Sequence, residues 1–231
     1  MGLGDQIKLI ANATLDVIYP NNCNLCQTNL LMHEKFMCQS CTAELPFLSM
    51  AADQQKLNQL FWGRAQIESI HSLMIYQKGN NVRDLLQLLK YQNKTKLAQY
   101  LGELLGEKLN ENPNYHAIIP IPLHPKKLRA RGFNQSKVIA EGIRKVINIP
   151  VQDDWIKRVH HNTSQTKVSK YDRWDNVRSI FELSKPKNFR NQHVLVIDDV
   201  LTTGATLESC IYLLNKVEGC KVSVATLAAR I

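Results

Sequence analysis

No apolar run in the sequence approaches the roughly 20 residues that a helix needs to cross a bilayer. The N-terminus lacks a basic stretch followed by an apolar core, so a secretory signal peptide is not expected. Internal repeats, low-complexity tracts and long linkers are also missing. These absences predict a soluble, cytoplasmic protein without a membrane span.

Acidic residues are scarce relative to basic ones. The 231 residues include 29 Lys and Arg against 20 Asp and Glu, a formal net charge of +9. Residues 120–178 hold 13 of the basic and 5 of the acidic residues, a local balance of 13 − 5 = +8. The excess predicts an anionic partner, which charge alone leaves open as nucleic acid, a phosphorylated small molecule or a membrane surface. A merely solvated basic face is the alternative.

The apolar periodicity predicts strands that alternate with helices. Strands are expected near 67–76, 116–122, 151–159, 179–183, 193–198 and 221–228, and helices near 3–18, 53–60, 82–91, 97–109, 134–147 and 205–217. This alternation indicates an α/β fold with a parallel sheet. Trp62 and Trp155 are expected in its core, whereas Trp174 lies in a basic loop where it would be able to stack on a base.

Four cysteines are spaced as C-x2-C-x11-C-x2-C: Cys23, Cys26, Cys38 and Cys41. Two such pairs place four thiolates around one point, the closed tetrahedral arrangement of structural Zn²⁺. So short a segment buries too little apolar surface to fold without the metal. We therefore expect two domains: residues 1–50 with a zinc-ribbon-like module, and residues 51–231 with the sheet.

Other interpretations of the cysteines remain open at this level. They are a pair of disulfides, a redox-active CxxC, an iron–sulfur cluster, or a site in which His33 replaces one ligand. A cytoplasmic protein disfavours stable disulfides, and two CxxC pairs disfavour a thioredoxin-type site.

The segment Val194–Thr206, VLVIDDVLTTGAT, carries the sharpest chemical signal. An apolar strand is followed by Asp198 and Asp199, at the strand end where ligands bind in open α/β sheets. Adjacent carboxylates suit the vicinal hydroxyls of a ribose and favour a developing cation at its anomeric carbon. Directly before a helix come backbone and hydroxyl donors suited to a phosphate: Thr202, Thr203, Gly204, Ala205 and Thr206.

Val194–Thr206 resembles the phosphoribosyl pyrophosphate (PRPP) signature of type I phosphoribosyltransferases. Together with the four-cysteine segment, Lys90-Tyr91 and PIPLHPKKLRARGFNQS (120–136), it makes the whole chain resemble the ComF family. The resemblance implies a type I phosphoribosyltransferase-like fold, binding of PRPP with Mg²⁺, and a part in DNA uptake during natural transformation. Competence-machinery proteins are the implied partners.

The resemblance also assigns roles to residues. Asp198 and Asp199 would be the catalytic, ribose-binding pair, and residues 202–206 would bind the 5′-phosphate. The loop that contacts the diphosphate and its Mg²⁺ would be Pro120, Ile121, Pro122 and Leu123. Residues 162–176 look like the mobile loop that closes over the diphosphate, or else a surface loop.

The basic segment after this loop divides into two predicted roles. Arg131 is expected to contact phosphate, because a guanidinium grips two oxygens at once. Asn134 is expected either to join it or to cap the following helix. Three residues remain available for single-stranded DNA: Lys126, Lys127 and Arg129.

Two functions compete. The chain is either an enzyme that transfers phosphoribose from PRPP to a nitrogen nucleophile, or a binding protein that senses PRPP or a nucleotide and engages DNA or a partner through its basic face. A zinc-finger transcription factor is disfavoured, because no basic recognition helix follows the cysteines. The sequence does not define the acceptor.

Overall fold

The computed structural model describes residues 21–49, 51–77, 79, 81–91, 94–109, 114–159 and 180–231. The chain divides into two compact units, Met1–Leu45 and Pro46–Ile231, which we describe separately. The predicted helix at 3–18 and the predicted mobile loop at 162–176 lie outside the described residues. In the described part of the chain, every helix is too short or too polar to pass through a bilayer.

The first unit is built from short loops and one described helix, α2 (Gln39–Ala43). The Cys23 N–H donates to the Thr28 carbonyl at 2.8 Å, and an isolated bridge joins Asn22 to Asn29. Cys38 caps the start of α2, since its side chain accepts from the Cys41 N–H. Local hydrogen bonds therefore hold the cysteine-containing turns.

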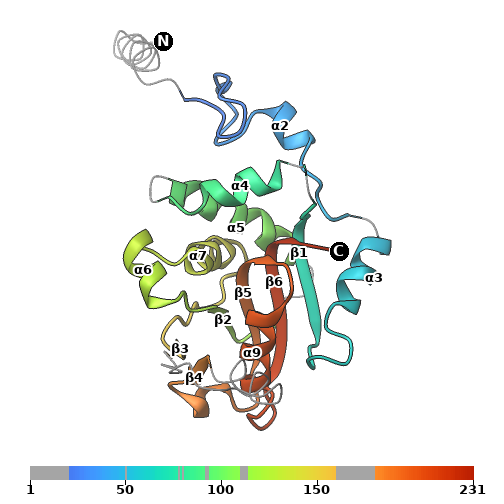
Figure 1. Cartoon of the computed structure of the whole chain (residues 1–231), viewed down its shortest axis with the longest axis vertical. Helices are drawn as coiled ribbons and strands as arrows, with labels where there is room; N and C mark the ends of the chain where they lie inside the picture. The colour runs from blue at the N-terminus through green and yellow to red at the C-terminus, as the bar shows by residue number, and fades with distance from the viewer. Residues whose placement is uncertain are drawn as a thin grey trace, which may run out of the picture. The chain divides into compact units, whose positions relative to one another are not determined.

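A four-stranded parallel sheet forms the centre of the second unit (Figure 1). Its strands lie in the order β1 (Ser69–Ile75), β6 (Lys221–Ala229), β5 (His193–Leu201) and β2 (Ala117–Pro120). All three neighbouring pairs are parallel, so the C-terminal ends of the four strands meet at one edge. The predicted α/β class is confirmed.

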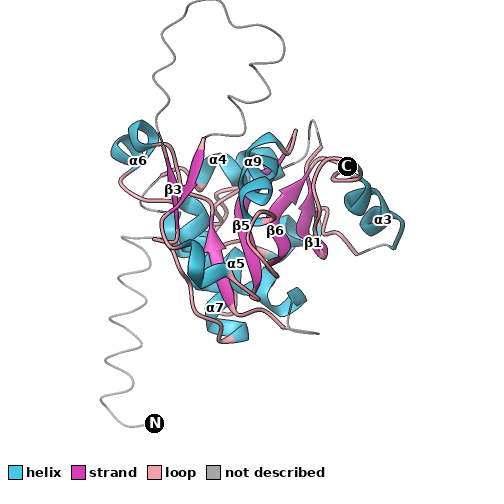
Figure 2. Ribbon diagram, turned by 90° about the horizontal axis from the view of Figure 1, so that it is seen from below, coloured by secondary structure: helices cyan, strands magenta, loops and turns pink. Residues whose placement is uncertain are grey.

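Helices cover both faces of this sheet (Figure 2). α5 (Thr95–Leu109) and α7 (Gln135–Ile147) lie on one face, and α9 (Ala205–Leu214) lies on the other. Alternation along β5 explains this: Val194 and Val196 join the apolar cluster that includes α9, so Leu195 and Ile197 point the other way. The strand is buried on both faces, which is why it reads as a continuous apolar run.

The remaining elements lie around this core. They are α3 (Ala51–Gln59), α4 (Val82–Leu88), α6 (Pro125–Arg131), a short 3-10 helix η2 (Pro186–Phe189), and the antiparallel pair β3 (Ile156–Arg158) and β4 (Phe181–Leu183).

Helices α5 and α7 approach each other at glycines. A Cβ placed on Gly142 would lie 2.1 Å from the Gln99 carbonyl oxygen and 2.9 Å from the Gly102 Cα. Both contacts are with backbone, which cannot move aside as a side chain does. The close packing of α5 on α7 therefore requires glycine at 142.

Replacing Gly142 with alanine is expected to destabilise the second unit by about 1–3 kcal/mol or more, the usual cost of overpacking. Its melting temperature should fall by several degrees in a thermal unfolding scan. Gly106→Ala is the graded comparison, since a Cβ there meets the Val146 Cβ at 3.0 Å and the Ile143 backbone at 3.2 Å, a milder overlap, and gains the same helix propensity. Equal melting temperatures for the two variants would contradict the interpretation.

Several predictions made from the sequence differ from the structure. Strand β5 continues to Leu201, so Asp198 and Asp199 lie within it rather than after it. The expected strand at 151–159 is reduced to β3 and an isolated bridge at Val151. The basic segment forms helix α6, because Pro125 occupies its first turn and Gly132, with φ +78°, ends it. Trp62, expected in the core, is 80% exposed.

Candidate functional site

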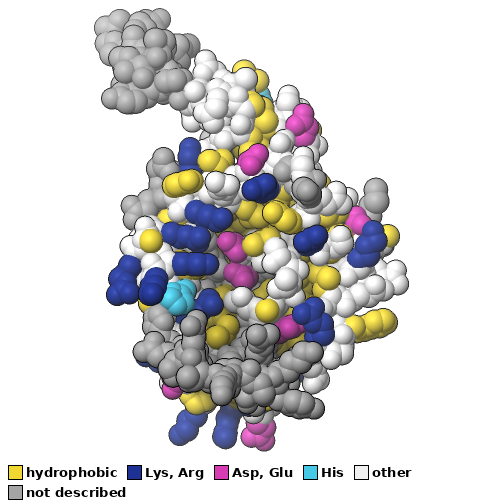
Figure 3. All heavy atoms as spheres, in the orientation of Figure 1, with side chains coloured by type: hydrophobic (Ala, Val, Ile, Leu, Met, Phe, Trp, Pro, Cys, Tyr) yellow, Lys and Arg dark blue, Asp and Glu magenta, His cyan; other side chains and the backbone are white. Residues whose placement is uncertain are grey.

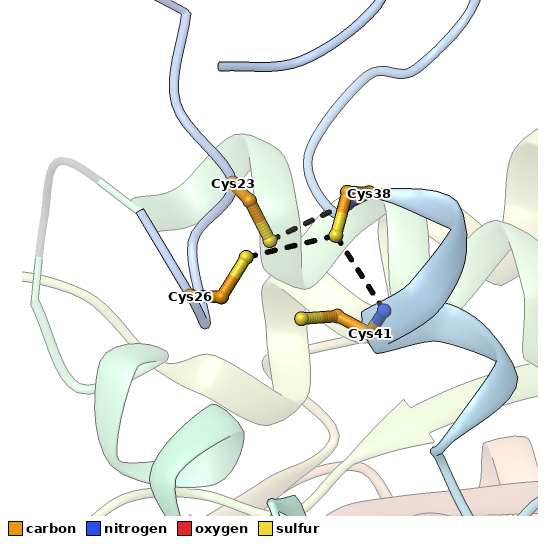
Figure 4. Close-up of side chains that lie close together, drawn as sticks. All are labelled: Cys23, Cys26, Cys38 and Cys41. Carbon is orange, nitrogen blue, oxygen red and sulfur yellow. Dashed lines mark hydrogen bonds between the residues drawn. The ribbon is translucent and has the colours of Figure 1, made fainter. Parts of the chain in front are cut away.

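The four cysteines of the first unit converge on one point (Figure 4). Their sulfur atoms all lie within 4.8 Å of one another, and the Cys26 and Cys38 sulfurs are 3.6 Å apart. Four thiolates at about 2.3 Å from a zinc ion would be separated by roughly 3.8 Å. The cluster therefore matches a site for a metal ion such as zinc. All six cysteines of the chain are free thiols in the structure, which therefore does not contain the pair of disulfides considered above.

Backbone and side-chain donors lie close to several of these sulfurs. The Cys38 N–H donates to the Cys23 sulfur at 3.3 Å, and the Cys41 N–H donates to the Cys38 sulfur at 3.5 Å. Hydrogen bonds from Thr28 lower the pKa of Cys26 to about 6. Burial and the neighbouring cysteines raise the pKa of Cys41 instead, so a bound cation would be needed to hold all four sulfurs as thiolates, the form that binds metal.

Asp198 and Asp199 lie where β5 passes the end of its neighbour β2. Pro120, the last residue of β2, pairs with Ile197, and the following residues of β5 pair with β6 alone among the described strands. Both carboxylates are only partly buried. They therefore lie at the C-terminal edge of the sheet, on the side that β2 leaves open, as fold rules for ligand sites predict.

Hydrogen bonds hold the Asp198 carboxylate in place, while its surroundings disfavour its ionised form. Its Oδ1 accepts from the Ser136 hydroxyl at 3.2 Å and from the Asp199 N–H at 2.9 Å. Burial and the adjacent Asp199 raise the pKa of Asp198 to about 7. Burial also raises the pKa of Asp199. A bound cation, or hydroxyl groups that donate hydrogen bonds, would stabilise the ionised form of such a pair.

Three cations act on this pair from different elements. The charge of Arg158 on β3 lowers the pKa of Asp198, and the charges of Arg131 and Lys90 lower that of Asp199. Arg131, predicted from the sequence, is thus near the pair, whereas nothing in the sequence had singled out Arg158. The site mixes carboxylates with cations, as a phosphorylated sugar would require.

A turn after β5 forms the second part of the site. Thr202 and Thr203 are exposed, and Gly204 has φ +80° at the N-cap of α9. The Glu208 N–H already donates to the Gly204 carbonyl, but the first N–H groups of a helix have no partner within it. They suit an anion at the helix N-terminus. This is the predicted phosphate segment at 202–206.

Arg64 fixes this turn from a distant part of the chain. Its guanidinium donates to the Thr203 carbonyl at 2.9 Å and pairs with Glu208 in the first turn of α9. The ring of Phe61 lies 3.8 Å from where a Gly204 Cβ would be. Sequence reasoning missed both residues, because no local pattern links 61–64 to 203–208.

The loop at 120–123 adjoins the carboxylates. The Ile121 N–H donates to the Ile197 carbonyl at 2.8 Å, and the Ile121 carbonyl accepts from the Asn134 side chain at 2.9 Å. The Asn134 oxygen accepts from the Ser136 N–H at 3.1 Å, so Asn134 caps α7. The cap, one of the two roles expected for Asn134, is thus confirmed. A cavity of about 620 Å³ borders Pro122, Leu123 and Phe133.

Gln135 lies beside the residues that hold Asp198. It is 2% exposed, and its side-chain nitrogen is buried without a hydrogen-bond partner among the described residues. It directly precedes Ser136, which binds Asp198. An unpaired buried donor is costly, so a water or ligand atom would be stabilised beside it.

Helix α6 carries an exposed cationic surface. Lys126, Lys127 and Arg129 are exposed, and none of the ion pairs found among the described residues includes them. Figure 3 shows lysine and arginine side chains gathered on the side of the molecule where α6 lies. Arg131, at the end of the same helix, is partly buried and acts on Asp199. Helix α6 therefore carries both the residue expected to contact phosphate and the three residues expected to contact DNA.

A family model for the phosphoribosyl transferase domain matches residues 133–231. This stretch contains α7, β5, α9 and β6, and with them both carboxylates and the turn at Gly204. The match and the parallel sheet confirm the predicted type I phosphoribosyltransferase-like fold.

Three curated proteins are similar to this chain. Competence protein F of Haemophilus influenzae is 34% identical over 139 residues, which cover 57% of this chain and 61% of that protein. Competence protein ComFC of Bacillus subtilis is 27% identical over 66% of this chain and 62% of its own length. DNA utilization protein YhgH of Escherichia coli K12 is 26% identical over 56% of this chain and 59% of its own length. Each match thus spans about three fifths of the relative.

Proposed function

On the similarity to the competence proteins and the match to the phosphoribosyl transferase domain, we propose that the chain is a member of the ComF family, that its second unit binds PRPP together with Mg²⁺, and that it serves the uptake or use of DNA in competence. The observation that carries the proposal is the placement of Asp198 and Asp199 at the sheet edge that also ends in the Gly204 turn, where the charges of Arg158, Arg131 and Lys90 act on them. A phosphorylated ribose needs this combination of groups.

Each part of PRPP has a counterpart in the site. The N–H groups after Gly204 receive the 5′-phosphate, and the two carboxylates accept hydrogen bonds from the ribose hydroxyls. Arg131 and the loop at 120–123 position the diphosphate. The carboxylates offer the oxygen donors that Mg²⁺ prefers, and the bound ion would neutralise charge on the diphosphate.

The same geometry serves phosphoribosyl transfer to a nitrogen nucleophile. In that reaction the bond from the anomeric carbon to the diphosphate oxygen breaks and its electron pair leaves with the diphosphate, a bond to nitrogen forms, and the proton that the nitrogen loses passes to the diphosphate or to water. The carboxylates stabilise the cationic centre that develops between these two events. The cavity beside Pro122 and Phe133 is our candidate for the acceptor.

We also propose that the cysteine cluster holds a structural Zn²⁺. Four protein sulfurs complete a tetrahedron, so no coordination position would remain for a substrate. The ion would stabilise the first unit and would not take part in the reaction.

PRPP binding is tested with the full chain and Mg²⁺ by calorimetric titration. The unmodified chain should bind one equivalent, and Arg131→Gln should bind about tenfold more weakly, because a charge-assisted contact is lost. Arg129→Gln is the matched control on the same helix, since its side chain is exposed. Absence of PRPP binding, or equal losses in the two variants, would refute the assignment. Release of labelled pyrophosphate with a panel of bases and amines then tests turnover.

Helix α6 supports a second function, contact with single-stranded DNA. Replacing Lys126, Lys127 and Arg129 together with glutamine should weaken DNA binding at low salt. The slope of log affinity against log salt should become less steep by about 2, since each phosphate contact on a single strand contributes about 0.7.

The matched control for this DNA measurement is the exposed triple variant Lys187→Gln, Arg190→Gln and Lys216→Gln, which removes the same charge. Salt slopes that change equally in both triple variants would show that net charge, not α6, governs binding.

A further inference from the structure

A second polar cavity lies at the opposite edge of the sheet from the carboxylates. Ser69, His193 and Lys221 are the first residues of β1, β5 and β6, and all three line it. Because the strands are parallel, this is the N-terminal edge of the sheet. The cavity has a volume of about 910 Å³, and His71, Lys108 and Tyr115 also contribute to its lining.

Three strands join in one hydrogen-bonded chain at this cavity. The Ser69 hydroxyl donates to the Ser223 oxygen at 2.8 Å; His71 Nε2 lies 3.0 Å from the Ser69 oxygen, and His193 Nε2 lies 2.8 Å from the Ser223 oxygen. Ser223 is fully buried in the central strand β6. A fully buried hydroxyl in the central part of the sheet needs such partners.

With the Ser69 hydroxyl donating to Ser223, one set of ring protons satisfies the network. A hydroxyl has one proton, so Ser69, which gives its proton to Ser223, accepts from His71 Nε2–H. Ser223 in turn gives its proton to His193 Nε2. Neutral His193 then carries its ring proton on Nδ1, and neutral His71 keeps Nδ1 as an acceptor. Burial lowers the pKa of both rings, which favours these neutral forms.

Positive charge in the cavity exceeds negative charge. Lys108 and Lys221 line it against one acidic residue, Glu68. The Lys108 ammonium is partly buried and donates to the carbonyls of Leu48 and Ser72, and none of the ion pairs among the described residues includes it. Of its three N–H bonds, one remains for another acceptor. A partly buried cation on a residue that lines a cavity, with no carboxylate partner among the residues the structure describes, favours an anionic ligand.

The size and aromatic lining narrow the class of ligand. A bare phosphate would leave most of the cavity empty, since sites of 300–1,000 Å³ hold molecules of cofactor size. Tyr115 packs edge-on against His193, with ring centroids 4.9 Å apart. These two rings offer an aromatic surface beside the cations.

We propose that the cavity at the N-terminal edge of the sheet is a second ligand site, which binds a nucleoside monophosphate. Lys108 and Lys221 receive the phosphate, and the Tyr115–His193 pair contacts the base. Because this cavity shares none of the residues assigned to PRPP, the inference does not depend on the proposed function.

The test uses AMP as probe and the full-length Asp199→Asn chain, in which the first site lacks one of its two carboxylates; the Lys221→Gln variant and the histidine signals described below separate the two sites. Calorimetric titration should show one saturable equivalent of AMP, with adenosine and inorganic phosphate each binding at least tenfold more weakly. Lys221→Gln should weaken AMP binding about fivefold to tenfold, because its exposed side chain contributes a charged contact without holding the fold. Lys216→Gln is the charge-matched control.

Histidine side-chain NMR locates the binding. AMP should perturb the ring signals of His71 and His193 and leave those of His33, in the first unit, unchanged. No saturable binding of AMP, equal affinity for adenosine or for phosphate, an unaltered affinity in Lys221→Gln, or unmoved His71 and His193 signals would each overturn the proposal.

Discussion

Replacing Cys26 by serine is expected to release the metal of the first unit and unfold residues 21–45, while the second unit keeps its own melting transition. Cys26 is exposed, so the substitution removes a ligand without leaving a cavity. A structural zinc contributes about 10–16 kcal/mol to the folding of small modules, and so short a segment has no core to replace it. Loss of one ligand of four should therefore remove most of the order of this unit.

Two measurements check this expectation on the intact chain. Metal analysis should find one zinc per unmodified chain and little in Cys26→Ser, and limited proteolysis should cut the variant within residues 21–45 first. Cys220→Ser is the control, because its thiol lies outside the cluster and should leave the zinc content unchanged. Full zinc occupancy in Cys26→Ser would contradict the four-cysteine assignment, and joint unfolding of both units would contradict their independence.

The sequence predicted best those features that local pattern determines. Helix α7 was expected at 134–147 and spans Gln135–Ile147, since its apolar spacing and its Asn134 cap are both local signals. The phosphate turn was equally readable, because Gly204 and the flanking hydroxyls are contiguous. The paired CxxC spacing located the metal cluster for the same reason.

Features that depend on distant contacts were not predicted. Ser136 lies 62 residues from the carboxylate it binds, and Arg64 lies 139 residues from the carbonyl it holds. No periodicity connects such positions; only the parallel pairing of β2 with β5 and the approach of α7 bring them together. Arg158 and Lys90 were missed as parts of the site for the same reason.

For helix α6, the sequence indicated the charge but not the helix. The sequence KKLRAR drew attention to its charge, and no helix was expected there. Pro125, however, occupies the first turn, where its missing N–H costs nothing, and His124 accepts from the Lys126 N–H as a cap. As a helix, the segment keeps Lys126, Lys127 and Arg129 exposed while Arg131 approaches Asp199, so one element can serve two anionic ligands.

The site shows a conflict between stability and binding that single substitutions should expose. Asp198 titrates near pH 3.8 when unperturbed but with a pKa of about 7 in the folded chain, because of burial and the charge of Asp199. Between these values the folded state holds a proton that the unfolded state has released. Stability should therefore fall as the pH rises from about 4 to 7 and stay low above pH 7.

Asp198→Asn should accordingly raise the melting temperature at pH 8 and change it little at pH 4. The amide keeps an oxygen to accept from Ser136 and from the Asp199 N–H, so packing is preserved. The same change should weaken binding of PRPP with Mg²⁺ at pH 8 by about a hundredfold or more, since a charged contact to ribose or metal is lost. A variant that is both more stable and inactive in binding is the signature of a functional carboxylate.

Asp154→Asn is the control with the opposite sign. A hydrogen bond from Lys185 lowers the pKa of Asp154, so its contribution to stability is present at neutral pH and is lost as the pH falls. Because this pair is exposed, the effect should be small, and PRPP binding should not change. Retained PRPP binding in Asp198→Asn would remove Asp198 from the site. The melting temperature of Asp198→Asn should differ from that of the unmodified chain by more at pH 8 than at pH 4. An equal difference at the two pH values would show that ionisation of Asp198 does not destabilise the fold.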